Sequence, residues 1–237
     1  MSPGDEAAAA VVQRAPFHRD LSLVAPRGLR FTVIDKETGA IIRRAETEAC
    51  FSFHHVNAFE EDGTVVLDLI TYPDSRIIDA LYLDELRAGK AVPQGLLTRF
   101  AIPLGEGPVS QQSLSATPLE LPRMAYRRFA GRRHRYVWGV GQLRRGFLDS
   151  LVKQDLETAK AAVWAEKDGF PGEPVFVPAP NAGAEDEGVL LSVVLDGEGG
   201  RSFLLVLDAA TMLERARAFA PHAIPFGFHG NYFPNAA

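Results

Sequence analysis

The chain has 237 residues, of which 46% are hydrophobic, enough to bury the core of one large domain or two small ones. Its formal net charge of -5 argues against nucleic acid as a partner, because phosphate binding needs a positive field. No apolar run approaches the length that spans a membrane. The densest basic run, residues 123–145, is expected to be a solvated loop face or a set of packed arginine stems rather than a binding patch.

The single cysteine, Cys50, excludes an intrachain disulfide and favours a reducing, cytoplasmic setting. We expect it to be a small buried hydrophobe, because a nucleophile would need a partner base that the sequence does not reveal.

Residues 1–26 are expected to form a flexible tail. Their apolar stretch, residues 7–12, is short and follows Asp5 and Glu6 rather than positive charge, so it is not typical of a signal peptide. The folded region is expected to span residues 27–237 without a further domain boundary.

From residue 30 onward the chain reads mostly as short strands broken by turns. Residues 30–34 and 40–44 flank a turn that begins at Asp35, which predicts a strand, a tight turn and a second strand. The order of a hydrophobic strand followed by Asp-x-x-Thr recurs at Asp155 and Asp208. In each turn the aspartate can accept hydrogen bonds from backbone amides ahead of it.

A second repeated device is an acidic turn that ends in glycine. It occurs at residues 61–63 before an apolar run, and again at residues 185–188. Irregularly spaced repeats of such strand pairs favour the blades of a β-propeller over a sandwich. The predicted fold class is therefore all-β.

Two segments have helical character. Residues 77–86 carry apolar side chains among good helix formers, which predicts a short helix or helical loop. Residues 148–167 also have helical propensity, but the Asp155 turn lies in their middle. For that reason we predict a hairpin there.

Two distant segments each set a histidine among aromatic, glycine and proline residues. They are residues 53–61, with His54, and residues 224–234, with His229. Such a composition is typical of an imidazole held rigidly in a dry pocket. The residues alone leave two interpretations open, a metal ligand and a core histidine satisfied by a backbone carbonyl.

The segments FHHVNAFEEDG and PFGFHG, with LELPR and GEPVFVP between them in this order, resemble the carotenoid oxygenase family of non-haem iron enzymes. That family also includes stilbene-cleaving members and a retinoid isomerase. The resemblance runs from about residue 27 to the C-terminus and corresponds to the C-terminal half of such an enzyme. It implies part of a seven-bladed β-propeller with short helical loop insertions.

The resemblance also implies Fe(2+) as cofactor, held in the family by four histidines. His54 and His229 match two of these ligands, and the other two belong to the other half of the enzyme. Imidazole suits iron that binds dioxygen, because it is a neutral and firmly placed donor. His55 follows His54 directly, and successive side chains of a strand point to opposite faces, so His55 is assigned a structural role.

Glu120 of LELPR and Glu173 of GEPVFVP stand where the family keeps glutamates that orient the ligating histidines. Each lies beside proline and apolar residues, where a carboxylate needs a partner. The alternative for both is a structural salt bridge with a nearby arginine. The remaining histidines, His18, His134 and His222, match no family ligand and are predicted to be surface or turn residues.

By resemblance, the function is that of an iron(II)-dependent dioxygenase that cleaves a conjugated carbon–carbon double bond in a carotenoid, apocarotenoid or similar apolar polyene. The alternative is a catalytically inactive, truncated or split half-propeller that lacks two of the four iron-ligating histidines. Expected partners are the polyene, dioxygen, a separate N-terminal half and, for substrate uptake, a membrane surface. Several aromatic residues near the motifs could line a substrate tunnel or simply pack in the core: Phe51, Phe53, Phe59, Phe226, Phe228, Tyr232 and Phe233.

Overall fold

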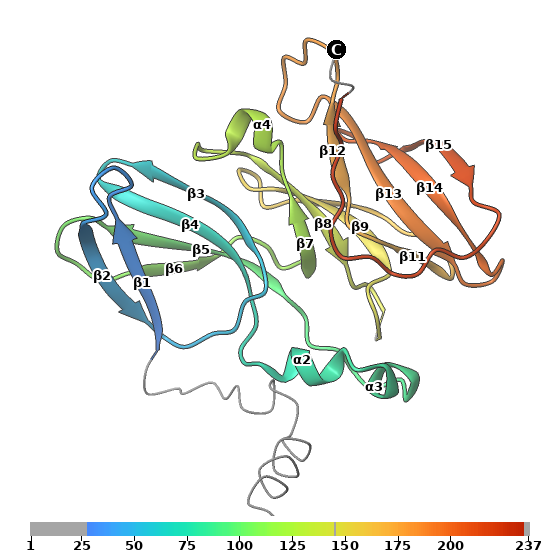
Figure 1. The fold of residues 1–237 in the computed structure, drawn as a ribbon, viewed down its shortest axis with the longest axis horizontal. Helices are drawn as coiled ribbons and strands as arrows, with labels where there is room; N and C mark the ends of the chain where they lie inside the picture. Colours follow the sequence, from blue (N-terminus) through green and yellow to red (C-terminus); the bar gives the residue numbers. More distant parts are fainter. Residues whose placement is uncertain (1–27, 145, 235–237) are drawn as a thin grey trace, which may run out of the picture.

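The computed structural model describes residues 28–144 and 146–234, which form four antiparallel sheets side by side (Figure 1). In chain order, the first sheet has two strands, the second and third have four each, and the fourth has five. The first two sheets contain β1 (Leu29–Ile34), β2 (Ile41–Thr47), β3 (His55–Glu61), β4 (Thr64–Thr71), β5 (Leu96–Pro103) and β6 (Ser110–Ser113). The third contains β7 (Leu119–Arg123), β8 (Tyr136–Gly141), β9 (Ser150–Asp155) and β10 (Ala161–Trp164).

The fourth sheet contains β11 (Gly169–Pro171), β12 (Val175–Pro178), β13 (Gly188–Asp196), β14 (Arg201–Asp208) and β15 (Glu214–Phe219). Both β11 and β12 pair with β13, at opposite ends of that strand, so together they form one interrupted first strand. The chain is thus all-β and forms part of a β-propeller, as predicted, and the sheets do not close into a ring within the described residues.

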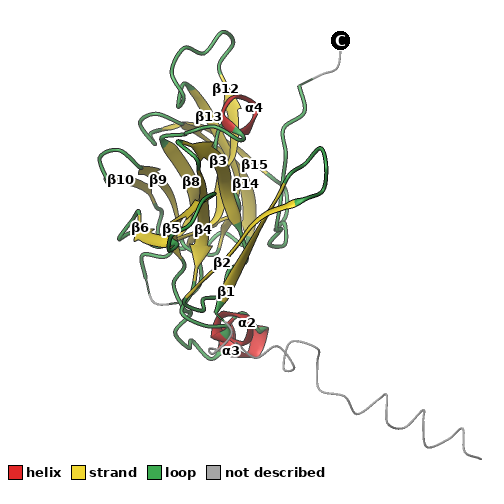
Figure 2. Cartoon of the chain, turned by 90° about the vertical axis from the view of Figure 1, so that its left-hand side faces the viewer, coloured by secondary structure: helices red, strands yellow, loops and turns green. Residues whose placement is uncertain are grey.

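The short helices lie outside the sheets. They are α2 (Arg76–Ala80), α3 (Leu83–Arg87) and α4 (Tyr126–Phe129). Figure 2 shows α2 and α3 together at one end of the sheets, which confirms the helix predicted for residues 77–86. In the part of the chain that the structure describes, no helix has the length and apolar character needed to cross a membrane.

The three Asp-x-x-Thr turns are confirmed and share one geometry. The side chains of Asp35, Asp155 and Asp208 accept backbone N–H groups two and three residues ahead. The turns join β1 to β2, β9 to β10, and β14 to β15, so the hairpin predicted within residues 148–167 is also confirmed. In each turn the residue after the threonine has a positive φ, with values of 72°, 56° and 60° for Gly39, Ala159 and Met212.

These turns reveal the place of each strand within its sheet. In the third and fourth sheets the Asp-x-x-Thr turn joins the third strand to the fourth, when β11 and β12 are counted as one strand. In addition, a fourth strand is followed along the chain by the first strand of the next sheet, as β6 is followed by β7. By both criteria, β1 and β2 are the third and fourth strands of their sheet. By the second criterion, residues 224–234, which follow β15, occupy the position of a first strand. We call residues 224–234 the C-terminal segment.

The hydrophobic core lies between neighbouring sheets. Phe31 of β1 and Phe100 of β5 pack between the first and second sheets. Leu97 and Val137 belong to the cluster between the second and third sheets, and Trp138 belongs to the cluster between the third and fourth. Because burial is shared by adjacent sheets, each one depends on its neighbour for an apolar face to pack against.

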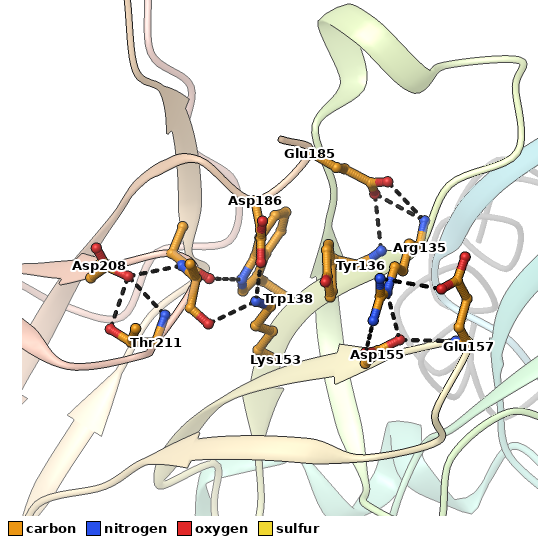
Figure 3. Close-up of polar contacts among 12 residues, drawn as sticks. Arg135, Tyr136, Trp138, Lys153, Asp155, Glu157, Glu185, Asp186, Asp208 and Thr211 are labelled. Atoms are coloured by element: carbon orange, nitrogen blue, oxygen red, sulfur yellow. Dashed lines mark hydrogen bonds and ion pairs between the residues drawn. The ribbon is translucent and has the colours of Figure 1, made fainter. Parts of the chain in front are cut away.

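Polar contacts also join the third and fourth sheets (Figure 3). The buried Lys153 donates from Nζ to Asp186 at 2.5 Å and to the Ala210 carbonyl at 2.8 Å. Trp138 donates its indole N–H to the Ala209 carbonyl at 3.1 Å. The acidic turn at residues 185–188, which precedes β13 as predicted, supplies Asp186 and so takes part in this contact.

Four arginines of the basic run have acidic partners, namely Arg123, Arg133, Arg135 and Arg144. Arg135 pairs with Asp155 at 2.7 Å, and this contact holds the pKa of the Asp155 carboxyl well below its usual range. Arg133 pairs with Glu61 on the second sheet. These ion pairs agree with the expectation that the arginines of this run pack against the protein or face solvent.

One histidine prediction is wrong. His134 was expected at the surface, but it is 4% exposed and lies against Asn57 and Asp68 of the second sheet. Burial lowers the pKa of its imidazole. His222 is exposed, as predicted, whereas His18 and the tail predicted for residues 1–26 lie outside the described residues.

Candidate metal centre

Four residues predicted from the sequence meet at one place, and each comes from a first strand or its equivalent. His54 directly precedes β3, and Glu120 lies on β7. Glu173 lies in the interruption between β11 and β12, and His229 lies in the C-terminal segment. We call these four residues the candidate metal centre. First strands bring together residues that are far apart in the sequence, because equivalent strands of neighbouring blades face a common axis.

The first pair is His54 with Glu120. The Nδ1 atom of His54 lies 2.5 Å from Oε2 of Glu120, and the glutamate is only 7% exposed. Two further donors hold the carboxylate, the Tyr72 hydroxyl at 2.9 Å and the backbone N–H of Leu121 at 2.6 Å. The hydrogen bond with Glu120 raises the pKa of the His54 imidazole, and burial opposes that effect in part.

The second pair is His229 with Glu173. Nδ1 of His229 lies 3.0 Å from Oε1 of Glu173, and the Gly230 N–H donates to Oε2 at 2.8 Å. The guanidinium of Arg123 approaches the same carboxylate at 3.7 Å. Glu173 therefore has both of the partners that the sequence left open, a histidine and an arginine.

The two imidazoles face one another. Their ring centroids are 5.2 Å apart, and the ring planes are nearly perpendicular, at 83°. In both rings a carboxylate engages Nδ1, so Nδ1 carries the proton and Nε2 is left as the electron-pair donor. The role of these histidines as metal ligands stays a prediction, and the geometry suits it.

Irregular backbone accompanies the centre on two first strands. The pairing register shifts between His55 and Asn57 on β3, and between Glu120 and Arg123 on β7. Leu121, inside the second shift, has a φ of 48°, which is uncommon for a residue other than glycine. Bulges of this kind re-aim side chains and are common beside functional sites.

Gly139 of β8 allows the neighbouring strand to approach Glu120. A Cβ atom at this position would lie 2.7 Å from the Glu120 carbonyl oxygen and 2.1 Å from a Leu119 methyl carbon. Both distances are too short for any side chain. His55 is exposed at the first position of β3, where its backbone pairs in register with Leu69.

The aromatic residues near the motifs fall into two groups. Phe51 and Phe53 pack edge to face at 4.8 Å and cover Tyr72. Phe226, Phe228 and Tyr232 line an apolar groove of about 330 Å³ together with the Glu173 and His229 pair and side chains of the fourth sheet. The other two are elsewhere: Phe59 packs against His134, and Phe233 is 78% exposed.

Sequence reasoning did not single out Tyr72 or Arg123 as parts of the centre. Tyr72 follows β4 and carried no signal in the sequence, because only folding places its hydroxyl beside Glu120. Arg123 had a usable signal, since it is the last residue of LELPR, three positions after Glu120.

The side chains of the centre supply only part of the donor set that a metal ion requires. In the part of the chain that the structure describes, no group of three or more histidine, cysteine, aspartate or glutamate side chains could hold a metal ion. The centre offers two neutral imidazole nitrogens whose other nitrogens are oriented by carboxylates, and imidazole is a suitable donor for iron. The residues present therefore fit one part of an iron site.

The fold and the candidate metal centre together define a class of protein. Its members are β-propellers in which the first strands bring histidines together, and a carboxylate supports each histidine. Residues 9–234 match the family model described as retinal pigment epithelial membrane protein. The chain belongs to this family, the carotenoid oxygenase family.

Relatives and solved structures agree with this assignment. The chain is 35% identical to the mitochondrial carotenoid-cleaving dioxygenase of Macaca fascicularis, over 86% of this chain and 44% of that protein. It is 36% identical to the torulene dioxygenase of Fusarium fujikuroi, over 89% of this chain and 42% of that protein. Cobalt-substituted Synechocystis apocarotenoid oxygenase superposes with a TM-score of 0.74 and 31% identity, over 84% of this chain and 43% of that one. The chain thus spans less than half the length of the relatives it matches.

Proposed function

We propose that this chain is part of an iron(II)-dependent dioxygenase that oxidatively cleaves a conjugated carbon–carbon double bond in a carotenoid, apocarotenoid or similar apolar polyene. The observation that carries the proposal is the pair of imidazoles 5.2 Å apart, each with a glutamate on Nδ1. The relatives named carotenoid-cleaving dioxygenase and torulene dioxygenase support the substrate class.

In this proposal His54 and His229 would hold Fe(2+) through Nε2. When bound, the iron would supply the binding and activation of dioxygen. Glu120 and Glu173 keep the proton on Nδ1 of each ring and raise the basicity of Nε2. The apolar groove beside His229 offers van der Waals contact to an apolar substrate.

Two histidines provide too few protein ligands for a firmly bound iron, so the remaining ligands must come from other residues. We propose that they come from a polypeptide with the rest of the propeller, here called the N-terminal half. The strand positions support this proposal. Within the described residues, β1 and β2 form a sheet of only two strands, and the C-terminal segment pairs with no strand, so both have free edges on which further strands could pair.

The competing function is a catalytically inactive half-propeller. It is favoured by the same shortage of ligands, because an underligated metal is solvated and exchangeable. In the dioxygenase proposal, Fe(2+) is the cofactor, and the polyene and dioxygen are the substrates. We also propose for it a cytoplasmic location, with peripheral membrane contact during substrate uptake. Neither proposal includes nucleic acid as a binding partner.

The two functions are separated by measuring iron content and apocarotenoid cleavage. The chain would be purified alone and after co-expression with the N-terminal half of a relative, and tested with an apocarotenoid under air. We expect weak iron binding and no cleavage by the chain alone, and recovery of both in the complex. His54→Ala or His229→Ala should abolish them, while His222→Ala, at an exposed position, should not.

A stable complex that contains both halves but no iron would favour the inactive half-propeller. Stoichiometric iron and cleavage by the lone chain would refute the shortage of ligands. In that case a second copy of the chain, or histidines outside the centre, would supply the missing donors.

A further inference from the structure

Arg123 contacts the C-terminal segment at several points. Its Nη2 donates to the Gly230 carbonyl at 3.1 Å and lies 3.5 Å from Oδ1 of Asn231. Its Nη1 lies 3.7 Å from the Glu173 carboxylate, which is the partner of His229. The guanidinium thus contacts Gly230 and Asn231, which follow His229 in the chain, and Glu173, which is the hydrogen-bond partner of His229.

The bulge in β7 is what turns Arg123 toward the fourth sheet. In a regular strand, residues four apart share a side, so Arg123 would face the same way as Leu119, toward the second sheet. Four residues of β7, from Glu120 to Arg123, lie opposite only three of β8, from Val140 to Trp138. The extra residue reverses the alternation, and Arg123 shares its side with Trp138, which stacks on Phe176 of the fourth sheet.

The C-terminal segment has few other attachments. It forms no strand, and the His229 side chain is 57% exposed. The backbone N–H of Ile224 donates to Ser202, but from residue 225 to 234 every described polar contact with the rest of the chain goes to Arg123 or Glu173. The apolar groove adds contacts without fixing direction. The position of His229 therefore depends on these two side chains.

We propose that Arg123 is a positioning residue that docks the C-terminal segment onto Glu173 and so sets the place of His229 opposite His54. The LELPR motif then serves both histidines: Glu120 orients His54 directly, and Arg123 orients His229 through Glu173 and Gly230. The purpose of this arrangement rests on the proposed function, whereas the docking itself can be measured without metal.

The test is hydrogen–deuterium exchange of the metal-free, full-length chain, read in peptides that cover residues 225–234 and 55–61. Arg123→Gln removes the charge and the fork of donors. Within residues 225–234, the N–H that donates to another part of the chain is that of Gly230, to Glu173, so we expect its exchange to become about tenfold faster or more, with no change in β3. Arg132→Gln, in the same basic run and exposed, is the matched control and should change neither peptide.

A second measurement separates positioning from general loosening. Long-range proton–nitrogen NMR reports which ring nitrogen carries the proton, and His229→Asn assigns the signal. In Arg123→Gln we expect the His229 ring to shift toward a mixture of tautomers, while the His54 ring keeps its proton on Nδ1. Arg123→Lys retains a charge beside Glu173 but loses the planar fork, so it should give an intermediate result.

Unchanged exchange in residues 225–234 of folded Arg123→Gln would overturn the inference. If that variant does not fold, unchanged exchange in Arg123→Lys overturns it equally. Equal changes at His54 and His229 would show a general structural role and also overturn it. Exchange could become faster only in residues 225–234 while the complex of the two halves holds no iron. That result would support the positioning role of Arg123 and refute the proposed function.

Discussion

The two histidine–glutamate pairs use the same bond but differ in what holds them. His54 precedes a strand of a four-stranded sheet, and its carboxylate partner is fixed by Tyr72 and a backbone amide. His229 lies in a segment without strand pairing among the described residues, and its side chain is 57% exposed against 21% for His54.

The difference shows that this chain builds one side of the centre from its own sheets and holds the other side by a few side-chain contacts. Order on the first side follows from the cooperative packing of two sheets. On the second side it follows from Arg123, Glu173 and an apolar groove with one open face. We therefore expect the two pairs to respond differently to substitutions of the same kind.

The largest effect is expected for the two glutamates. Glu120→Gln and Glu173→Gln should each weaken iron retention in the two-half complex, on the order of ten- to hundredfold, because each removes the charge that orients an imidazole. Glu173→Gln should lie at the upper end, because His229 lies in a segment that forms no strand and that depends on this carboxylate, whereas His54 directly precedes β3. Iron content after dialysis measures this, with the exposed Glu106→Gln as control. A larger loss for Glu120→Gln would reverse the comparison.

Gly139→Ala should damage the His54 pair selectively. Its Cβ would press on the backbone of Glu120, so we expect the free energy of unfolding to fall by about 1–3 kcal/mol. Urea denaturation measures this, and Gly105→Ala, where no atom lies within 4 Å of the added Cβ, is the control. NMR should show a disturbed His54 ring and an unchanged His229 ring. Equal disturbance of both rings would contradict the independence of the pairs.

Tyr72→Phe should have a smaller effect on the same pair. Glu120 would lose one donor but keep the Leu121 amide and His54, so the cost should be about 1 kcal/mol of unfolding free energy. Tyr126→Phe is a suitable control, because that hydroxyl makes no hydrogen bond among the described residues. Thermal unfolding at pH 7 would measure both variants. No difference between them would mean that the Tyr72 hydroxyl does not hold Glu120.

The smallest effect concerns a buried histidine without a carboxylate hydrogen bond. His134 lies near Asp68, Arg99 and Arg133, and burial is the main cause of its lowered pKa. The unfolded histidine takes up a proton near its ordinary pKa of about 6.5, whereas the folded one does so only at lower pH. Stability is therefore retained above that pH and lost as the pH falls below it.

The measurement is the unfolding free energy between pH 7.5 and pH 5.5. His134→Gln should flatten this dependence, and the exposed His222→Gln should not. Identical slopes in the original chain and in His134→Gln would exclude a contribution from His134. The pKa of His54 shifts in the opposite direction because its imidazole donates a hydrogen bond to Glu120, so the two histidines report different environments.

The sequence by itself determined the local structure. The Asp35, Asp155 and Asp208 turns depend on contacts between residues two and three positions apart, so their pattern was visible in the chain. The all-β class followed from repeats of these turns. The four residues of the candidate metal centre were also identified, because each stands in a motif that resembles the family.

Only the tertiary structure decided what surrounds those residues. His134 was misplaced because its burial comes from packing against residues more than sixty positions away, on β3 and β4. The partners of Glu120 and of Arg123 are likewise distant, with Tyr72 48 positions from Glu120 and Gly230 107 positions from Arg123. The bulge at Leu121 turns Arg123 toward the fourth sheet, and no periodicity reveals it, since one extra residue reverses the alternation that a sequence pattern assumes.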